Sequence, residues 1–65
     1  MEIGSNTKLL STNELARYLN ISKPTVYRMI ENRQIPFHKI GGSIRFDHKE
    51  IQNFLDKNRI DPMHA

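Results

Sequence analysis

The chain has 65 residues, a formal net charge of +3 at neutral pH and no cysteine. Without thiols it can form neither a disulfide framework nor a thiolate metal site, and no segment reaches the roughly 20 apolar residues that a membrane span requires. A chain of this length buries only about 60% of its unfolded surface, so we expect one small domain. The polar N-terminus lacks a signal-peptide pattern, which predicts a cytoplasmic protein.

The positive charge is concentrated in the middle of the chain. Between residues 23 and 45, five Lys or Arg side chains stand against one acid, Glu31, whereas the other residues carry five cations and six acids. The middle segment therefore has a side-chain charge of +4 and the rest a charge of −1. Such a localised basic surface is typical of proteins that contact phosphates, although a solvated charged face gives the same count.

The chain divides into one domain and two short ends. Residues 1–8 are polar and include a glycine and a Ser-Asn pair, which predicts a flexible lead-in. Residues 59–65 contain a proline that opposes helix extension, which predicts a flexible tail. The domain is expected to cover residues 9–58.

Two short helices are expected in the first half of the domain. The first covers about residues 12–19, because Ser11 and Glu14 have the spacing of a capping box and apolar residues recur at helical intervals. The second begins after Ser22, a good N-cap residue, with Pro24 in its first turn, where a missing N–H is tolerated. Two helices separated only by "NIS" are typical of a helix-turn-helix.

A hairpin and a third helix are expected next. The segments "FHKI" and "SIRF" are short strand-like runs, and Gly41 and Gly42 between them favour a two-residue turn. Asp47 and Glu50 then have capping-box spacing, which predicts a helix over about residues 48–58. The order helix, helix, hairpin, helix predicts a mainly α domain with a small β-hairpin, a winged helix-turn-helix.

The apolar residues of these elements are expected to form the core rather than a ligand pocket. The predicted core comprises Leu10, Leu15, Ala16, Leu19, Ile21, Val26, Ile30, Ile35, Ile40, Phe46, Ile51, Phe54 and Leu55, with Met29 on the buried face of the second helix.

Enzymatic functions find no support in the sequence. His38, His48 and His64 lie in three different segments, and no metal-binding spacing of histidines occurs. The glycine pair matches neither a P-loop nor a dinucleotide-binding fingerprint, and a strand rather than a helix follows it. We therefore expect no catalytic residue, no metal, no other cofactor and no small-molecule ligand.

The second helix carries side chains of the types that bind DNA bases and phosphates. In a helix-turn-helix the second helix enters the major groove, and the outward residues here are Ser22, Lys23, Thr25, Tyr27 and Arg28, followed by Glu31 or Asn32. Arg28 can bind guanine bidentately, and Thr25 can contact a base or a phosphate. Lys23 is suited to a phosphate, whereas Tyr27 can bind a phosphate or pack against the core.

The hairpin carries a second set of candidate DNA contacts. It comprises Lys39, Gly41, Gly42, Ser43 and Arg45. Glycines permit close approach to the backbone, and an arginine favours the narrow, electronegative minor groove. The alternative for Arg45 is a structural one, in which it pairs with Asp47 or Glu50.

One long segment of the chain resembles a known family. The stretch "LSTNELARYLNISKPTVYRMIENRQIPFHKIGGSIRFDHKEIQNFL", from Leu10 to Leu55, resembles the excisionase-type DNA-binding domain, a small winged helix-turn-helix related to the N-terminal domain of MerR-type regulators. The resemblance implies a bacterial, phage or mobile-element protein that binds double-stranded DNA, with the second helix in the major groove and the wing in the minor groove. No coiled coil or effector domain follows the third helix, so we expect no ligand-responsive regulation.

Three functions remain open at this point. The resemblance favours a recombination directionality factor, which binds and bends DNA to assist excision by an integrase, often with cooperative self-association on the DNA. A small transcriptional regulator would use the same DNA chemistry. A protein-interaction domain that docks an acidic partner would also account for the basic middle segment.

Overall fold

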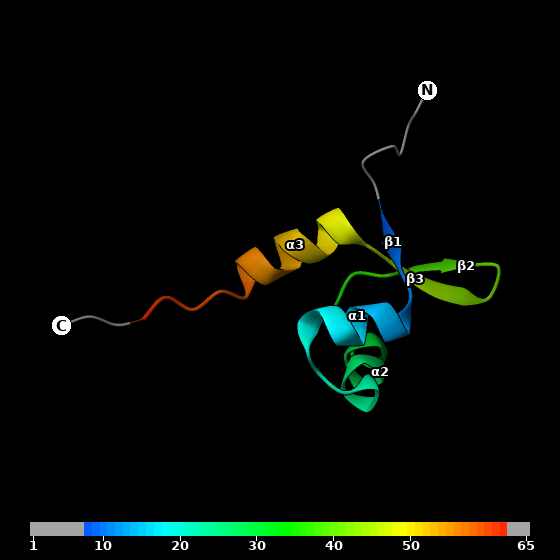
Figure 1. The fold of residues 1–65 in the computed structure, drawn as a ribbon, viewed down its shortest axis with the longest axis horizontal. Helices are drawn as coiled ribbons and strands as arrows, with labels where there is room; N and C mark the ends of the chain where they lie inside the picture. The colour runs from blue at the N-terminus through cyan, green and yellow to red at the C-terminus, as the bar shows by residue number, and fades with distance from the viewer. Residues whose placement is uncertain (1–7, 63–65) are drawn as a thin grey trace, which may run out of the picture.

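The computed structural model describes residues 8–62, which form three helices and a small antiparallel sheet. In chain order the elements are β1 (Leu9–Leu10), α1 (Thr12–Leu19), α2 (Lys23–Glu31), β2 (His38–Ile40), β3 (Ser43–Asp47) and α3 (His48–Lys57) (Figure 1). This arrangement is the predicted winged helix-turn-helix. Most of the predicted lead-in and the last residues of the predicted tail lie outside the described residues. Within residues 8–62, none of the helices has the length and apolar character that a membrane crossing demands.

α1 begins with the predicted capping box. The Ser11 hydroxyl accepts a hydrogen bond from the Glu14 N–H (3.1 Å), and the Glu14 carboxylate accepts one from the Ser11 N–H (2.9 Å). Because this backbone N–H favours the ionised carboxylate, it lowers the pKa of Glu14 below its ordinary value. The helix ends at Asn20, which adopts the left-handed conformation (φ 58°) that commonly closes a helix.

α2 follows α1 after a tight turn. The Ile21 N–H donates to the Ala16 carbonyl (3.0 Å), and the Ser22 hydroxyl caps α2 by accepting from the Thr25 N–H (3.3 Å). Pro24 occupies the first turn, as the sequence predicts. The caps on both sides of the turn fix the two helices as a helix-turn-helix.

β3 is the central strand of the sheet, which has the order β1-β3-β2. It pairs with β2 to form the predicted hairpin, and on its other side with β1, where Leu9 lies opposite Asp47 and Leu10 opposite Phe46. The sequence does not predict β1, because a strand of two residues has no periodicity to detect. β1 thus anchors the start of α1 to the base of the wing.

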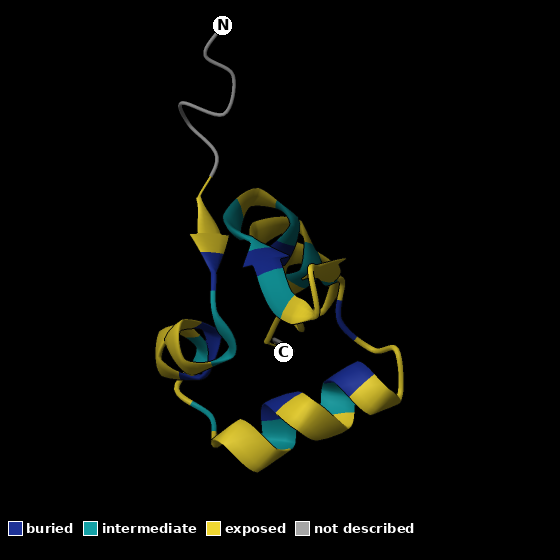
Figure 2. Ribbon diagram, turned by 90° about the vertical axis from the view of Figure 1, so that its right-hand side faces the viewer, coloured by how far each residue is buried: buried dark blue, intermediate teal, exposed yellow. Residues whose placement is uncertain are grey.

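The core lies between the helix pair, the sheet and α3 (dark blue in Figure 2). Its buried members all belong to the predicted set: Leu10, Leu15, Ala16, Val26, Ile30, Ile35, Phe46 and Ile51. Two predicted members are wrong, since Ile40 is 53% and Leu55 39% exposed. Ile40 ends β2 near the projecting hairpin tip, and Leu55 lies near the end of α3, where the preceding residue, Phe54, packs against the core instead.

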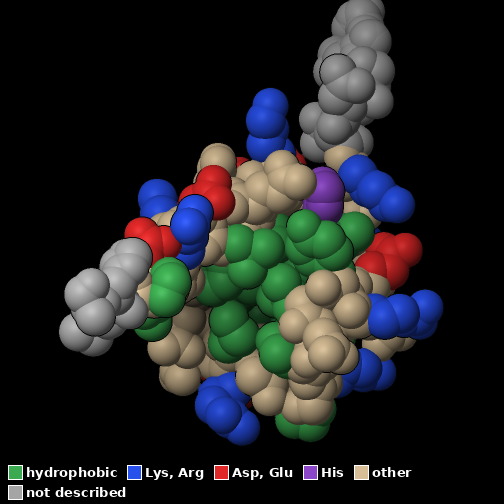
Figure 3. Space-filling view, turned by 60° about the vertical axis from the view of Figure 1, so that its left-hand side comes forward, with side chains coloured by type: hydrophobic (Ala, Val, Ile, Leu, Met, Phe, Trp, Pro, Cys, Tyr) green, Lys and Arg blue, Asp and Glu red, His purple; other side chains and the backbone are tan. Residues whose placement is uncertain are grey.

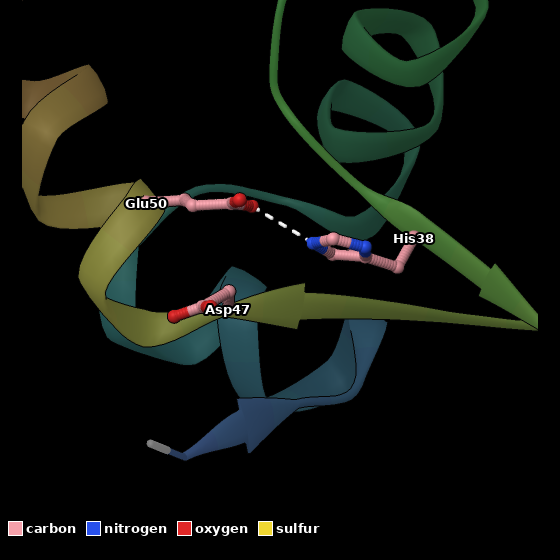
Figure 4. A group of neighbouring side chains, drawn as sticks. All are labelled: His38, Asp47 and Glu50. Carbon is pink, nitrogen blue, oxygen red and sulfur yellow. Dashed lines mark hydrogen bonds and ion pairs between the residues drawn. The ribbon is translucent and has the colours of Figure 1, made fainter. Parts of the chain in front are cut away.

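α3 begins at the end of β3 with Asp47 as its N-cap. The Asp47 carboxylate accepts a hydrogen bond from the Lys49 N–H (2.8 Å). The predicted capping box is wrong, because Glu50 does not return to the N-cap: its carboxylate lies 2.9 Å from Nε2 of His38 in β2 (Figure 4). His38, which lies in another strand, thus binds the carboxylate that the sequence pattern predicts at the cap of α3.

Candidate nucleic-acid interface

The predicted recognition residues lie along the exposed side of α2. Lys23 and Arg28 are exposed, and Tyr27 is 48% exposed, so Tyr27 is not a core residue. Thr25 is half-buried, and its hydroxyl lies 2.8 Å from the Ser22 hydroxyl, so both residues take part in the cap of α2. The exposed cations and the tyrosine of α2 are therefore accessible to a ligand.

The hairpin tip projects away from the rest of the domain. Gly41 (φ 56°) and Gly42 (φ 87°) form a two-residue turn between the paired residues Ile40 and Ser43. Two consecutive positive φ angles are typical of a type I′ turn, which confirms the predicted hairpin. A Cβ added at either glycine would meet no atom within 4 Å beyond the chain neighbours, so the tip is open to an approaching ligand.

Arg45 forms neither of the ion pairs, with Asp47 or with Glu50, that the sequence left open as its structural role. Its Nη1 donates to the Ile44 carbonyl (2.7 Å), and its side chain is half-buried. Among residues 8–62 no ion pair joins Arg45 to Asp47 or Glu50, whose carboxylates accept hydrogen bonds elsewhere. The guanidinium therefore keeps further N–H groups for an anionic ligand.

A groove of about 420 Å³ joins α2 to the wing. Its lining comprises Ser11, Thr12, Asn13, Lys23, Tyr27, Gly42, Ser43, Ile44 and Arg45. The structure thus brings together five of the ten predicted contacts, two from α2 and three from the hairpin. The other five lie outside this lining: Ser22, Thr25, Arg28, Lys39 and Gly41. The lining includes two cations and no acid, so the groove suits a phosphate group.

The start of α1 is a part of this groove that sequence reasoning missed. Ser11, Thr12 and Asn13 offer two hydroxyls and an amide at the positive end of the helix. In the sequence these residues indicate only a helix cap. Their position beside the wing depends on the pairing of β1 with β3, which the sequence did not reveal.

The side of the molecule away from the wing has a different character. Figure 3 shows hydrophobic side chains gathered at the centre of this face, with Lys and Arg around its rim. A groove of about 340 Å³ beside α3 is lined by Pro36, Glu50, Asn53, Phe54 and Lys57. One acid and one base balance each other there, so this groove lacks the excess positive charge of the groove at the wing.

A helix-turn-helix with a two-stranded wing beside its second helix defines a winged DNA-binding domain. The chain matches the family model described as "Helix-turn-helix domain" over residues 9–59, and it belongs to this family. This match confirms the helix-turn-helix part of the predicted resemblance.

The relatives of the chain include proteins named for DNA binding. It is 33% identical over 57 residues to the Mycobacterium tuberculosis proteins "Putative DNA-binding protein MT0521" (strain CDC 1551 / Oshkosh) and "Putative DNA-binding protein Rv0500A" (strain ATCC 25618 / H37Rv), covering 88% of this chain and 73% of each relative. It is 53% identical over 50 residues to "Putative antitoxin VapB50" of the H37Rv strain, covering 77% of this chain and 38% of that protein. No solved structure gave a significant match.

Proposed function

We propose that the chain binds double-stranded DNA in a sequence-specific manner, with α2 in the major groove and the hairpin against the adjacent backbone and minor groove. The observation that carries this proposal is the groove that joins Lys23 of α2 to Arg45 of β3 without an acid in its lining. A backbone phosphate in this groove would meet cations from both elements. Such a contact sets the orientation of α2 on the duplex.

Base recognition falls to the part of α2 outside the groove. Arg28 is exposed and does not line the groove, so it can reach a guanine and form two hydrogen bonds to it. Thr25, half-buried beside the cap, contributes a methyl group or a hydroxyl at shorter range. Lys39 and Gly41 extend the backbone contact along the wing. The protein acts by binding alone and has no catalytic activity in this proposal.

The cellular role that we propose is that of an excisionase-type recombination directionality factor. The resemblance over residues 10–55 supports this role, in which the protein bends DNA so that an integrase excises a mobile element. A single small domain covers few base pairs, so cooperative binding of several copies to neighbouring sites would supply the bend. The protein would act on DNA in the bacterial cytoplasm.

A regulatory role is the second candidate. The 53% identity with a protein named as an antitoxin favours it, because this chain would then be the DNA-binding part of an antitoxin or of another small regulator. Footprinting on the DNA that flanks its gene separates the two roles. Repeated sites beside a recombination junction support excision, whereas a single site over a promoter supports regulation and contradicts the excisionase role.

The salt dependence of binding tests the DNA-binding proposal itself. The logarithm of the association constant should fall linearly with the logarithm of the salt concentration, by about 0.9 per phosphate contacted. Lys23→Ala and Arg45→Ala should each reduce this slope by about one. Lys57→Ala, which removes an exposed cation of α3, is the matched control and should leave the slope unchanged. Absence of DNA binding at low salt would instead favour the protein-docking function.

A further inference from the structure

Three potential metal ligands from different elements meet at the base of the wing (Figure 4). They are His38 of β2, Asp47 at the end of β3 and Glu50 in the first turn of α3. One ligand atom from each lies within 4.8 Å of the others, and Nε2 of His38 is 2.9 Å from Oε1 of Glu50. None of the three residues lines the groove at the wing.

The backbone fixes this convergence. His38 lies opposite Arg45 in the β2–β3 register, and Arg45 and Asp47 share a face of β3 because alternate residues of a strand point the same way. His38 and Asp47 therefore lie on one face of the hairpin. Glu50 is three residues beyond Asp47, which places it one turn along α3 on the same side. β2, the end of β3 and the first turn of α3 thus bring the three side chains together.

Both carboxylates retain an oxygen that could bind an ion, and the side chains of His38 and Glu50 are open to solvent. Oδ1 of Asp47 accepts the Lys49 N–H (2.8 Å), which leaves Oδ2 available, and Oε1 of Glu50 holds His38, which leaves Oε2 available. The side chains of His38 and Glu50 are 48% and 42% exposed. An ion could therefore reach the cluster without opening the core.

The ligand set matches the preference of a divalent transition metal. Zn²⁺ binds imidazole nitrogens and carboxylate oxygens at about 2.0–2.2 Å, and a site with three protein ligands leaves a position for water. Ligand atoms in such a tetrahedral site are about 3.4 Å apart, so a contraction of roughly 1 Å or less per side chain closes the site around the ion. The two carboxylates also balance the charge of the ion, whereas Mg²⁺ prefers sites made of oxygen alone.

We propose that His38, Asp47 and Glu50 form a binding site for a divalent transition metal ion, with Zn²⁺ as the probe. The ion replaces the His38–Glu50 hydrogen bond and links β2, the outer strand of the wing, to the first turn of α3. Because the binding is measured without DNA, the proposal stands or fails independently of the proposed function.

Calorimetric titration of the metal-free full chain with ZnCl₂ tests the proposal. The wild type should bind one equivalent, and Asp47→Asn and Glu50→Gln should each weaken binding at least tenfold. Both variants preserve the fold, because asparagine caps a helix as well as aspartate and glutamine can still accept from His38. His48→Phe is the matched control, since it removes an imidazole but keeps an aromatic ring beside Tyr18, and it should bind within about twofold of the wild type.

A second measurement requires no variant. In ¹⁵N-labelled protein, Zn²⁺ should shift the amide resonances of residues 38 and 47–50, whereas Mg²⁺ at the same concentration should not. Shifts confined to other residues, equal zinc binding by Asp47→Asn and Glu50→Gln, or no saturable binding by the wild type would each overturn the proposal.

Discussion

Replacing both wing glycines by valine should disrupt the hairpin through the backbone alone. Gly41 and Gly42 have φ angles of 56° and 87°, and an added Cβ at either position meets no atom within 4 Å beyond its chain neighbours. Steric contact with the rest of the domain therefore adds nothing to the cost. An L-residue in the left-handed region costs about 1–2 kcal/mol, so the double variant should raise the free energy of the turn by about 2–4 kcal/mol.

The cost should appear in the wing rather than in the core. All three residues of β2 are exposed, so this strand can detach while the buried cluster stays intact. The free energy of global unfolding should therefore fall by less than the full penalty of the turn. DNA affinity should fall at least tenfold, because each 1.4 kcal/mol spent on rebuilding the wing weakens binding tenfold.

Three measurements on the same variant check this reasoning. Urea unfolding reports the core, hydrogen exchange of residues 38–40 reports the hairpin, and a fluorescent duplex reports DNA binding. Gly41→Asn is the matched control, because Asn-Gly is a preferred type I′ pair and should behave like the wild type. If the double valine variant kept wild-type exchange protection in β2 together with wild-type DNA affinity, the reasoning about both the turn and its contact would be refuted.

Three further predictions test the recognition helix, the core and the first cap. Arg28→Ala should cost about 1–3 kcal/mol of DNA binding and relax the preference at one base pair, measured with single-base-substituted duplexes; uniform weakening would reduce Arg28 to a phosphate contact. Phe46→Ala removes a fully buried ring and should cost about 3–5 kcal/mol in urea unfolding, whereas Ile40→Ala, at a site 53% exposed, should cost far less; equal losses would contradict the assigned core. The Ser11 backbone N–H lowers the pKa of Glu14 below its ordinary value of 4.5, so ionised Glu14 stabilises the fold fully above that pH. The stability difference between the wild type and Glu14→Gln should close as the pH falls through the lowered pKa, and a difference independent of pH would contradict the cap.

The features that the sequence predicts correctly are those set by neighbouring residues. The capping box of Ser11 and Glu14 joins residues three apart, and the cap of α2 is formed in the same way by Ser22. The glycine pair specifies its own turn, because few other residues adopt two consecutive positive φ angles. Local patterns of this kind predicted the bounds of α1, α3 and the two hairpin strands within about one residue, and the start of α2.

The features that the sequence does not predict depend on contacts between distant residues. β1 exists because Leu9 and Leu10 pair with the far end of β3, and two residues carry no pattern of their own. Glu50 has the spacing of a cap, yet it binds His38, twelve residues earlier in the chain. The contribution of Thr12 and Asn13 to the groove depends on the same pairing of β1 with β3, so the sequence alone could not predict it.

β3 connects the candidate DNA contacts to the stability of the fold. Phe46 is fully buried and pairs with Leu10 of β1, while the preceding residue, Arg45, lines the groove at the wing. The next residue, Asp47, caps α3 and belongs to the proposed metal cluster. Because consecutive residues of one strand serve the core, the groove and the cap, a shift of β3 changes all three together. The position of Arg45 relative to α2 is therefore set by the packing of Phe46, and a repacked core should alter DNA affinity even when every contact residue is retained.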